Sequence, residues 1–159
     1  MKIKRILVPV DFSAPSQEAL EYAAELAKPF SAELVALFVI EPIYYAGTDY
    51  AALSAGSLAG LVDEQRRSAR AELERLEKAW RKRRLTLRTV TQTGTPYRVI
   101  VDSAKRLKAD LIVMATHGRT GMSHLLMGSV SERVVRSAAC PVLTLHAGPR
   151  RRRAPARRR

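Results

Sequence analysis

The chain alternates between short apolar runs and longer segments whose apolar residues recur every three to four positions. The runs at 3–10, 33–40 and 110–115 are almost continuously apolar, which is typical of strands buried on both faces of a parallel sheet. Residues 85–92 alternate between apolar and polar side chains, a pattern that predicts a more exposed, edge-like strand. Residues 142–146 predict a short last strand.

Helices are expected in the segments between these strands. Ser13 is placed to cap the first helix, with Pro15 in its first turn. Residues 43–60 have no clear period and predict a loop, after which a long helix covers roughly 61–83. A third helix starts at Thr95-Pro96, and a fourth opens at Ser129. The apolar residues expected to face inward are Ala19, Leu20, Ala23, Ala24, Ala27, Phe30, Ala69, Leu73, Leu76, Trp80, Ile100, Ala104, Leu107, Val130, Val134, Val135 and Ala138.

This order of elements predicts an α/β fold, with a doubly wound five-stranded parallel sheet and helices on both faces. In such folds, ligands bind beyond the carboxyl ends of the strands. Two strand ends carry candidate site residues: Pro9-Val10-Asp11 after the first strand, and Ala115-Thr116-His117-Gly118 after the fourth.

Composition limits the class of protein. The chain has 159 residues, which suits one domain, expected over 1–147. It has one cysteine, Cys140, expected to be a small buried hydrophobe, and no apolar run near the length that spans a bilayer. We therefore expect a cytoplasmic protein that does not cross a membrane.

The net charge of +13 is concentrated at the C-terminus. Residues 150–159 hold seven arginines and no acid, and the rest of the chain has 21 basic and 15 acidic residues, a charge of +6. Residues 148–159 are expected to form a disordered tail. Such a tail predicts weak, non-specific nucleic-acid binding, although a solvated tail with little effect is an equal alternative.

The segment from Ala115 to Glu132 has the features of an anion-binding loop. Gly118 and Gly128 allow close approach of backbone N–H groups, and the helix opening at Ser129 offers unpaired N–H groups to phosphates. Arg119 adds a charged donor. Ser129 and Glu132 also fit a capping box, so Ser129 either caps its own helix or contacts a phosphate. Neither the P-loop pattern nor the dinucleotide fingerprint is present.

Two stretches, ILVPVDFS at 6–13 and DLIVMATHGRTGMSHLLMGSVSERVVRSAACPVLTL at 110–145, resemble the signatures of the universal stress protein family. The ATP-binding members have the loop G-x2-G-x9-G-[ST]. Here it reads Ala115-x2-Gly118-x9-Gly128-Ser129, with alanine in the first position. The resemblance implies ATP and Mg²⁺ as cofactors, strand order 3-2-1-4-5, and a homodimer paired through the last strand.

The same resemblance implies roles for individual residues. Asp11 would lie near the ribose and the metal-bound phosphates, and Val39 would line the adenine pocket. The residues expected around the phosphates are Gly118, Arg119, Gly128, Ser129 and Val130. Pro9, Val10, Ala115 and Ser131 complete the candidate site. Asp11 has a second interpretation, as a cap of its strand end.

Other functions stay open at this point. The leading one is a nucleotide-binding stress or signalling module without enzymatic activity. A slow ATPase or a nucleotide-transferring enzyme would need an added catalytic group, and a phospho-acceptor receiver would need several acids beside Asp11. A zinc site at His117 and His124 lacks further ligands. Tyr44, Tyr45 and Tyr50 either fold over the nucleotide or belong to a surface loop.

Overall fold

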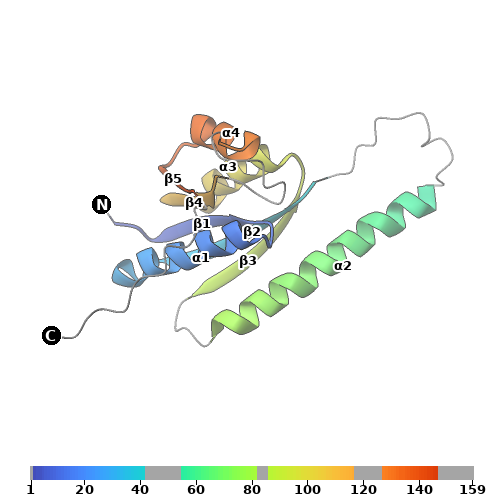
Figure 1. Ribbon diagram of the computed structural model, residues 1–159, viewed down its shortest axis with the longest axis horizontal. Helices are drawn as coiled ribbons and strands as arrows, with labels where there is room; N and C mark the ends of the chain where they lie inside the picture. The colour runs from blue at the N-terminus through green and yellow to red at the C-terminus, as the bar shows by residue number, and fades with distance from the viewer. Residues whose placement is uncertain (1, 42–54, 82–85, 117–126, 147–159) are drawn as a thin grey trace.

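The computed structural model describes residues 2–41, 55–81, 86–116 and 127–146. Its centre is one five-stranded sheet in the order β3-β2-β1-β4-β5, in which each neighbouring pair is parallel. The strands are β1 (Arg5–Val10), β2 (Glu33–Ile40), β3 (Leu87–Thr93), β4 (Leu111–Ala115) and β5 (Val142–Leu145). The fold class and strand order predicted from the sequence are confirmed (Figure 1).

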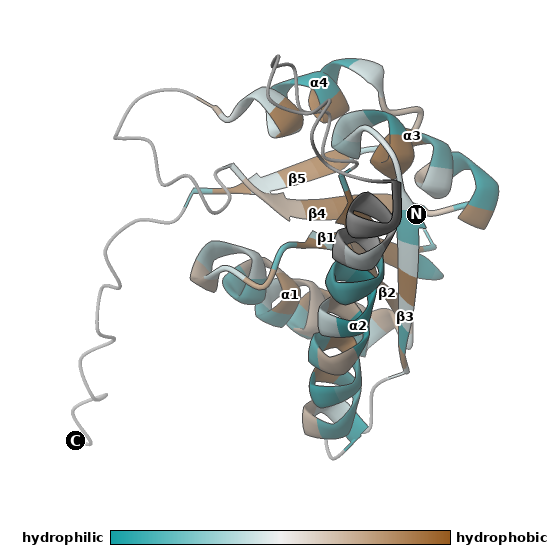
Figure 2. Cartoon of the chain, turned by 90° about the vertical axis from the view of Figure 1, so that its right-hand side faces the viewer, coloured by the Kyte–Doolittle hydropathy of each residue, from teal (hydrophilic) through white to brown (hydrophobic). Residues whose placement is uncertain are grey.

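Helices cover both faces of this sheet. They are α1 (Ala14–Ala27), followed by the 3₁₀ turn η1 (Lys28–Phe30), α2 (Ala55–Trp80), α3 (Pro96–Leu107) and α4 (Ser129–Ser137). The first two helices lie on one side of the sheet and the last two on the other (Figures 1 and 2). Because both faces are covered, the central strands β1, β2 and β4 are apolar on both sides.

Two apolar cores result from this arrangement. Ile6 and Val8 of β1 pack with α1 and α2, whereas Leu7 packs with Ile100 of α3 and Val134 of α4. The half-buried Cys140 packs beside the second core, and burial raises the pKa of its thiol. This agrees with the expected small hydrophobe.

Several predicted boundaries hold. Ser13 caps α1, because its hydroxyl oxygen accepts a hydrogen bond from the Ser16 N–H at 3.3 Å. Pro96 stands in the first turn of α3, and α4 begins at Ser129. β3 is an edge strand with half-exposed residues, as its alternating pattern predicts.

The predicted extent and inward faces of the helices were wrong in three places. α2 begins at Ala55 rather than near residue 61, because Gly56 and Gly60 weaken the helical signal without preventing a helix. Phe30 is 44% exposed since α1 ends at Ala27 and η1 turns the chain. Val135 is 47% exposed, since it lies about 100° around α4 from the buried Val134.

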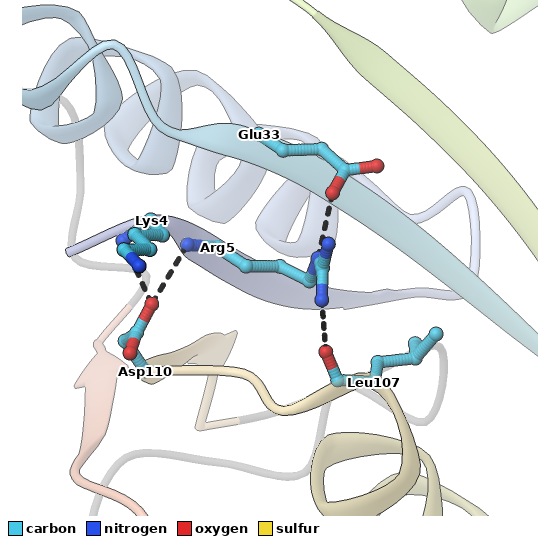
Figure 3. Close-up of polar contacts among 5 residues, drawn as sticks. All are labelled: Lys4, Arg5, Glu33, Leu107 and Asp110. Atoms are coloured by element: carbon cyan, nitrogen blue, oxygen red, sulfur yellow. Dashed lines mark hydrogen bonds and ion pairs between the residues drawn. The ribbon is translucent and has the colours of Figure 1, made fainter.

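A polar cluster joins the strands at their amino ends. The Asp110 carboxylate accepts hydrogen bonds from the backbone N–H groups of Lys4 (2.7 Å) and Arg5 (2.9 Å). The Arg5 guanidinium bonds Glu33 of β2 at 2.6 Å and the Leu107 carbonyl at the end of α3 (Figure 3). These contacts fix β1 between β2 and β4 at the end of the sheet opposite the strand ends that carry the candidate site.

Within the described ranges, no helix combines the length and apolar character needed to span a membrane.

Candidate functional site

A pocket of about 430 Å³ lies at the carboxyl ends of β1, β2 and β4, beside the starts of α3 and α4. All the described residues of the predicted site line it: Pro9, Val10, Asp11, Val39, Ala115, Gly128, Ser129, Val130 and Ser131. The sheet order explains this convergence, because β1 lies between β2 and β4 and the strand ends of all three meet there.

Gly118 and Arg119 lie outside the described residues, as do His117, His124, the three tyrosines of 44–50 and the arginine tail. Their predicted roles stay predictions.

The pocket also contains residues that sequence reasoning did not single out. Leu37, Ile100 and Met114 add to an apolar floor, and Glu41 follows β2 directly. Sequence reasoning could have identified Glu41, because it is a polar residue at the end of a central strand, like Asp11. Gln65 comes from the middle of α2, and no local pattern indicates which residue of a long amphipathic helix reaches a pocket.

Asp11 organises the turn that follows β1. Its Oδ1 atom accepts hydrogen bonds from the Ser13 N–H at 3.0 Å and the Ser13 hydroxyl at 2.5 Å. Its own N–H donates to the Ser16 hydroxyl at 3.3 Å. These contacts give Asp11 a structural role, and its place in the pocket wall is compatible with a ligand role as well.

The next residue, Phe12, adopts a left-handed backbone conformation, with φ of 65°. Bulky residues seldom do so, and such strain often occurs at functional turns. Its ring stacks on Phe38 with 4.7 Å between centroids. The stacking holds the chain in the sharp turn that leaves Asp11 at the pocket.

The junction between β4 and α4 is held by close backbone contacts. The Gly128 N–H donates to the Thr116 carbonyl at 2.8 Å. The buried Ser131 hydroxyl lies 2.9 Å from the same carbonyl oxygen and 2.8 Å from that of Gly128. A Cβ on Gly128 would stand 2.8 Å from the Thr116 oxygen. Glycine is thus required here for the approach of two backbone segments.

Ser129 does not cap α4. The N-cap residue is Gly128, which makes no side-chain cap hydrogen bond, and Glu132 pairs with Arg136 at 2.7 Å. The capping-box interpretation is therefore wrong, because the helix start is held through the Gly128–Thr116 backbone contact. The exposed Ser129 and the first-turn N–H groups of α4 border the pocket, and helix geometry gives these N–H groups no intrahelical acceptor.

The charged side chains among the described residues that line the pocket, Asp11 and Glu41, are both acidic. Among the described residues, no three His, Cys, Asp or Glu side chains gather at one place to hold a metal ion. Magnesium is commonly bound by one or two carboxylates together with substrate phosphates. Asp11 therefore fits a cation that arrives with its phosphates rather than one held by protein ligands alone.

Comparison with known proteins gives one consistent result. The universal stress protein family matches residues 2–146. The universal stress protein MJ0531 of Methanocaldococcus jannaschii is 37% identical over 142 residues, which are 89% of this chain and 81% of that protein.

Solved structures share the fold. The universal stress protein UspA from Lactobacillus plantarum is 28% identical, with a TM-score of 0.79 over 91% of this chain and 99% of that one. A universal stress protein from Archaeoglobus fulgidus in complex with dAMP is 22% identical, with a TM-score of 0.61 over 91% of this chain and 98% of that one.

Proposed function

This chain belongs to the universal stress protein family, and we propose that it binds ATP, with Mg²⁺, in the pocket at the carboxyl ends of β1, β2 and β4. The observation that carries the proposal is the convergence of nine residues, chosen from separate segments of the sequence, on one pocket. The proposed activity is binding of ATP, not its hydrolysis. In this proposal the bound nucleotide acts as a signal in the stress response.

The pocket wall divides into an apolar and a polar part. Leu37, Val39 and Met114 offer the apolar surface that a purine base requires. The start of α4 offers N–H groups and the positive end of the helix dipole to the phosphates. Asp11 lies at the end of β1, where its carboxylate would contact a cation held by those phosphates.

The dAMP complex of the Archaeoglobus fulgidus protein supports the proposal at the level of the fold. It is an instance of a protein with the same fold binding an adenine nucleotide.

The test is calorimetry with Mg-ATP and adenosine on nucleotide-stripped full-length protein. The informative variant is Ser129→Asp, because an acid in the first turn of a helix favours the helix but repels phosphate. We expect wild type to bind Mg-ATP. The variant should bind Mg-ATP about ten-fold or more weakly, because its carboxylate repels the phosphate oxygens. Adenosine binding and the melting temperature should change little.

Ser68→Asp is the matched control, since Ser68 is exposed on α2 and does not line the pocket. It should bind Mg-ATP like wild type. Absence of binding by folded wild-type protein at high micromolar Mg-ATP would contradict the proposal. An unchanged affinity in Ser129→Asp would move the phosphates away from α4.

A further inference from the structure

A second cavity of about 430 Å³ lies beside the first, between α3 and α4. Its wall consists of Tyr97, Ser129, Glu132, Arg133, Arg136 and Ser137. Ser129 lines both cavities, and Pro96 of the first is followed by Tyr97 of the second. The two cavities are therefore neighbours across the starts of α3 and α4, which lie side by side in both views (Figures 1 and 2).

One face of α4 connects them. Three charged residues follow Ser129 at helical spacing: Glu132 after three residues, Arg133 after four and Arg136 after seven. All four residues therefore lie along the same side of the helix. Arg133 stands four residues beyond Ser129, about 6 Å along the helix axis. A chain of phosphates that passed Ser129 would continue along this face.

The charged residues on this face differ in whether a residue of opposite charge pairs with them. Glu132 is engaged by Arg136 at 2.7 Å. Within the described part of the chain, Arg133 has no carboxylate at ion-pair distance. Its guanidinium carbon lies 5.1 Å from the centre of the Tyr97 ring. This contact orients the side chain without using its N–H donors, which are the groups that bind phosphate oxygens.

Arg98 strengthens the same cluster. Its guanidinium carbon lies 5.7 Å from the Tyr97 ring centre, and its Nε donates to the Tyr97 hydroxyl at 2.9 Å. Tyr97 thus contacts two arginines from two helices, of which Arg133 lines the second cavity. The charged residues that line the second cavity are Arg133, Arg136 and Glu132, so two positive charges face one negative charge there.

We propose that the second cavity is a phosphate subsite, through which the protein prefers nucleotides whose phosphate chain is longer than that of ATP. The inference rests on the proposed function, since the nucleoside occupies the first pocket. Adenosine tetraphosphate and diadenosine tetraphosphate both have a phosphate chain longer than that of ATP. They differ in whether the far end is free or carries a second nucleoside.

The experiment compares the magnesium complexes of ATP, adenosine tetraphosphate and diadenosine tetraphosphate by calorimetry on nucleotide-stripped full-length protein. Wild type should bind at least one tetraphosphate about ten-fold more tightly than ATP. One charge-assisted hydrogen bond between Arg133 and the added phosphate is sufficient for a gain of that size. Arg133→Gln should remove this gain and change the ATP affinity less than about two-fold. Tighter binding of the diadenosine form would identify a dinucleotide ligand, and tighter binding of adenosine tetraphosphate would identify a free chain end.

Arg106→Gln is the matched control, because Arg106 is exposed on α3 and lines neither cavity. It should keep the full preference. Equal affinities of wild type for ATP and both tetraphosphates would overturn the inference while leaving ATP binding intact. An equal loss for all three ligands in Arg133→Gln would also overturn it, since Arg133 would then belong to the ATP site. Failure of wild type to bind ATP would instead refute the proposed function.

Discussion

Gly128 illustrates how one residue can match a ligand motif for a structural reason. Its hydrogen atom faces the Thr116 carbonyl oxygen, where a Cβ would stand at 2.8 Å. Any side chain at this position would separate β4 from α4, so loss of ATP binding in a Gly128 variant would not by itself locate the phosphates. This is why the proposed test changes Ser129 and leaves Gly128 in place.

The steric requirement at Gly128 is directly measurable. Gly128→Ala should lower the free energy of unfolding by about 1–3 kcal/mol, the usual cost of forcing an atom into a packed site. Gly60→Ala is the control, because a Cβ on Gly60 of α2 meets nothing within 4 Å. That change should raise the free energy of unfolding by roughly 0.5–1 kcal/mol, since alanine favours the helix. Urea unfolding of both variants decides the matter, and equal effects would refute the steric account.

Asp110 gives the protein a predictable response to acid. The hydrogen bonds from the Lys4 and Arg5 N–H groups lower the pKa of the Asp110 carboxyl. A lowered native pKa means that the contribution to stability is complete above the unfolded pKa, about 3.9. That contribution is lost as the pH falls through the native value. We therefore expect Asp110→Asn to be less stable than wild type at pH 7, with the difference shrinking below about pH 4.

Chemical unfolding at a series of pH values from neutral to acid tests this expectation. Parallel stability curves for wild type and Asp110→Asn would show that the carboxylate does not respond in the predicted way.

At the scale of elements, β5 is one of the two edge strands of the sheet, and its residues are half-buried. It is short and apolar, with Leu143 and Leu145 packed against the first core. Unpaired edges invite pairing with another chain, and the family resemblance implies a homodimer through this strand. We propose that two copies of the chain pair along β5.

Thr144→Lys tests this pairing, because a charged residue on an edge strand opposes association. Light scattering at micromolar concentration should show a dimer for wild type and a monomer for Thr144→Lys. Thr91→Lys places the same charge on β3, the opposite edge, and should remain dimeric. A monomeric wild type, with or without ATP, would refute the prediction.

Across the whole molecule, structural and candidate functional residues occupy opposite ends of the sheet. The Asp110 cluster fixes the strands at their amino ends, and the pocket opens at their carboxyl ends. Substitutions in the cluster should therefore affect stability with little direct effect on ligand contacts. The arginine tail lies outside the described residues.

Seven arginines without an acid should bind any polyanion weakly. Fluorescence anisotropy with random-sequence duplex DNA should show binding by the full chain that falls steeply with salt, with a log–log slope no steeper than about −6. A chain truncated after residue 149 should lose this binding and keep its melting temperature. Equal DNA affinity of the truncated and full chains would place the binding surface on the folded domain.

The sequence, read together with the family resemblance, determined the strands, the sheet type and half of the residues that line the pocket. Buried strands must be apolar on both faces, so 33–40 and 110–115 were visible in the pattern, and carboxyl ends of parallel strands must meet at one edge. Asp11 and Ser129 could be grouped on that basis, with the strand order supplied by the family resemblance.

Tertiary structure decided what depends on distances between distant segments. Local spacing made Ser129 and Glu132 a capping box, but the Thr116 carbonyl holds the helix start and Arg136 engages Glu132. Gln65 reaches the pocket because of where α2 packs. Arg133 lies over Tyr97 because α3 and α4 are neighbours. Burial and helical period are local properties that sequence encodes directly, whereas contacts between elements depend on the geometry of the assembled sheet.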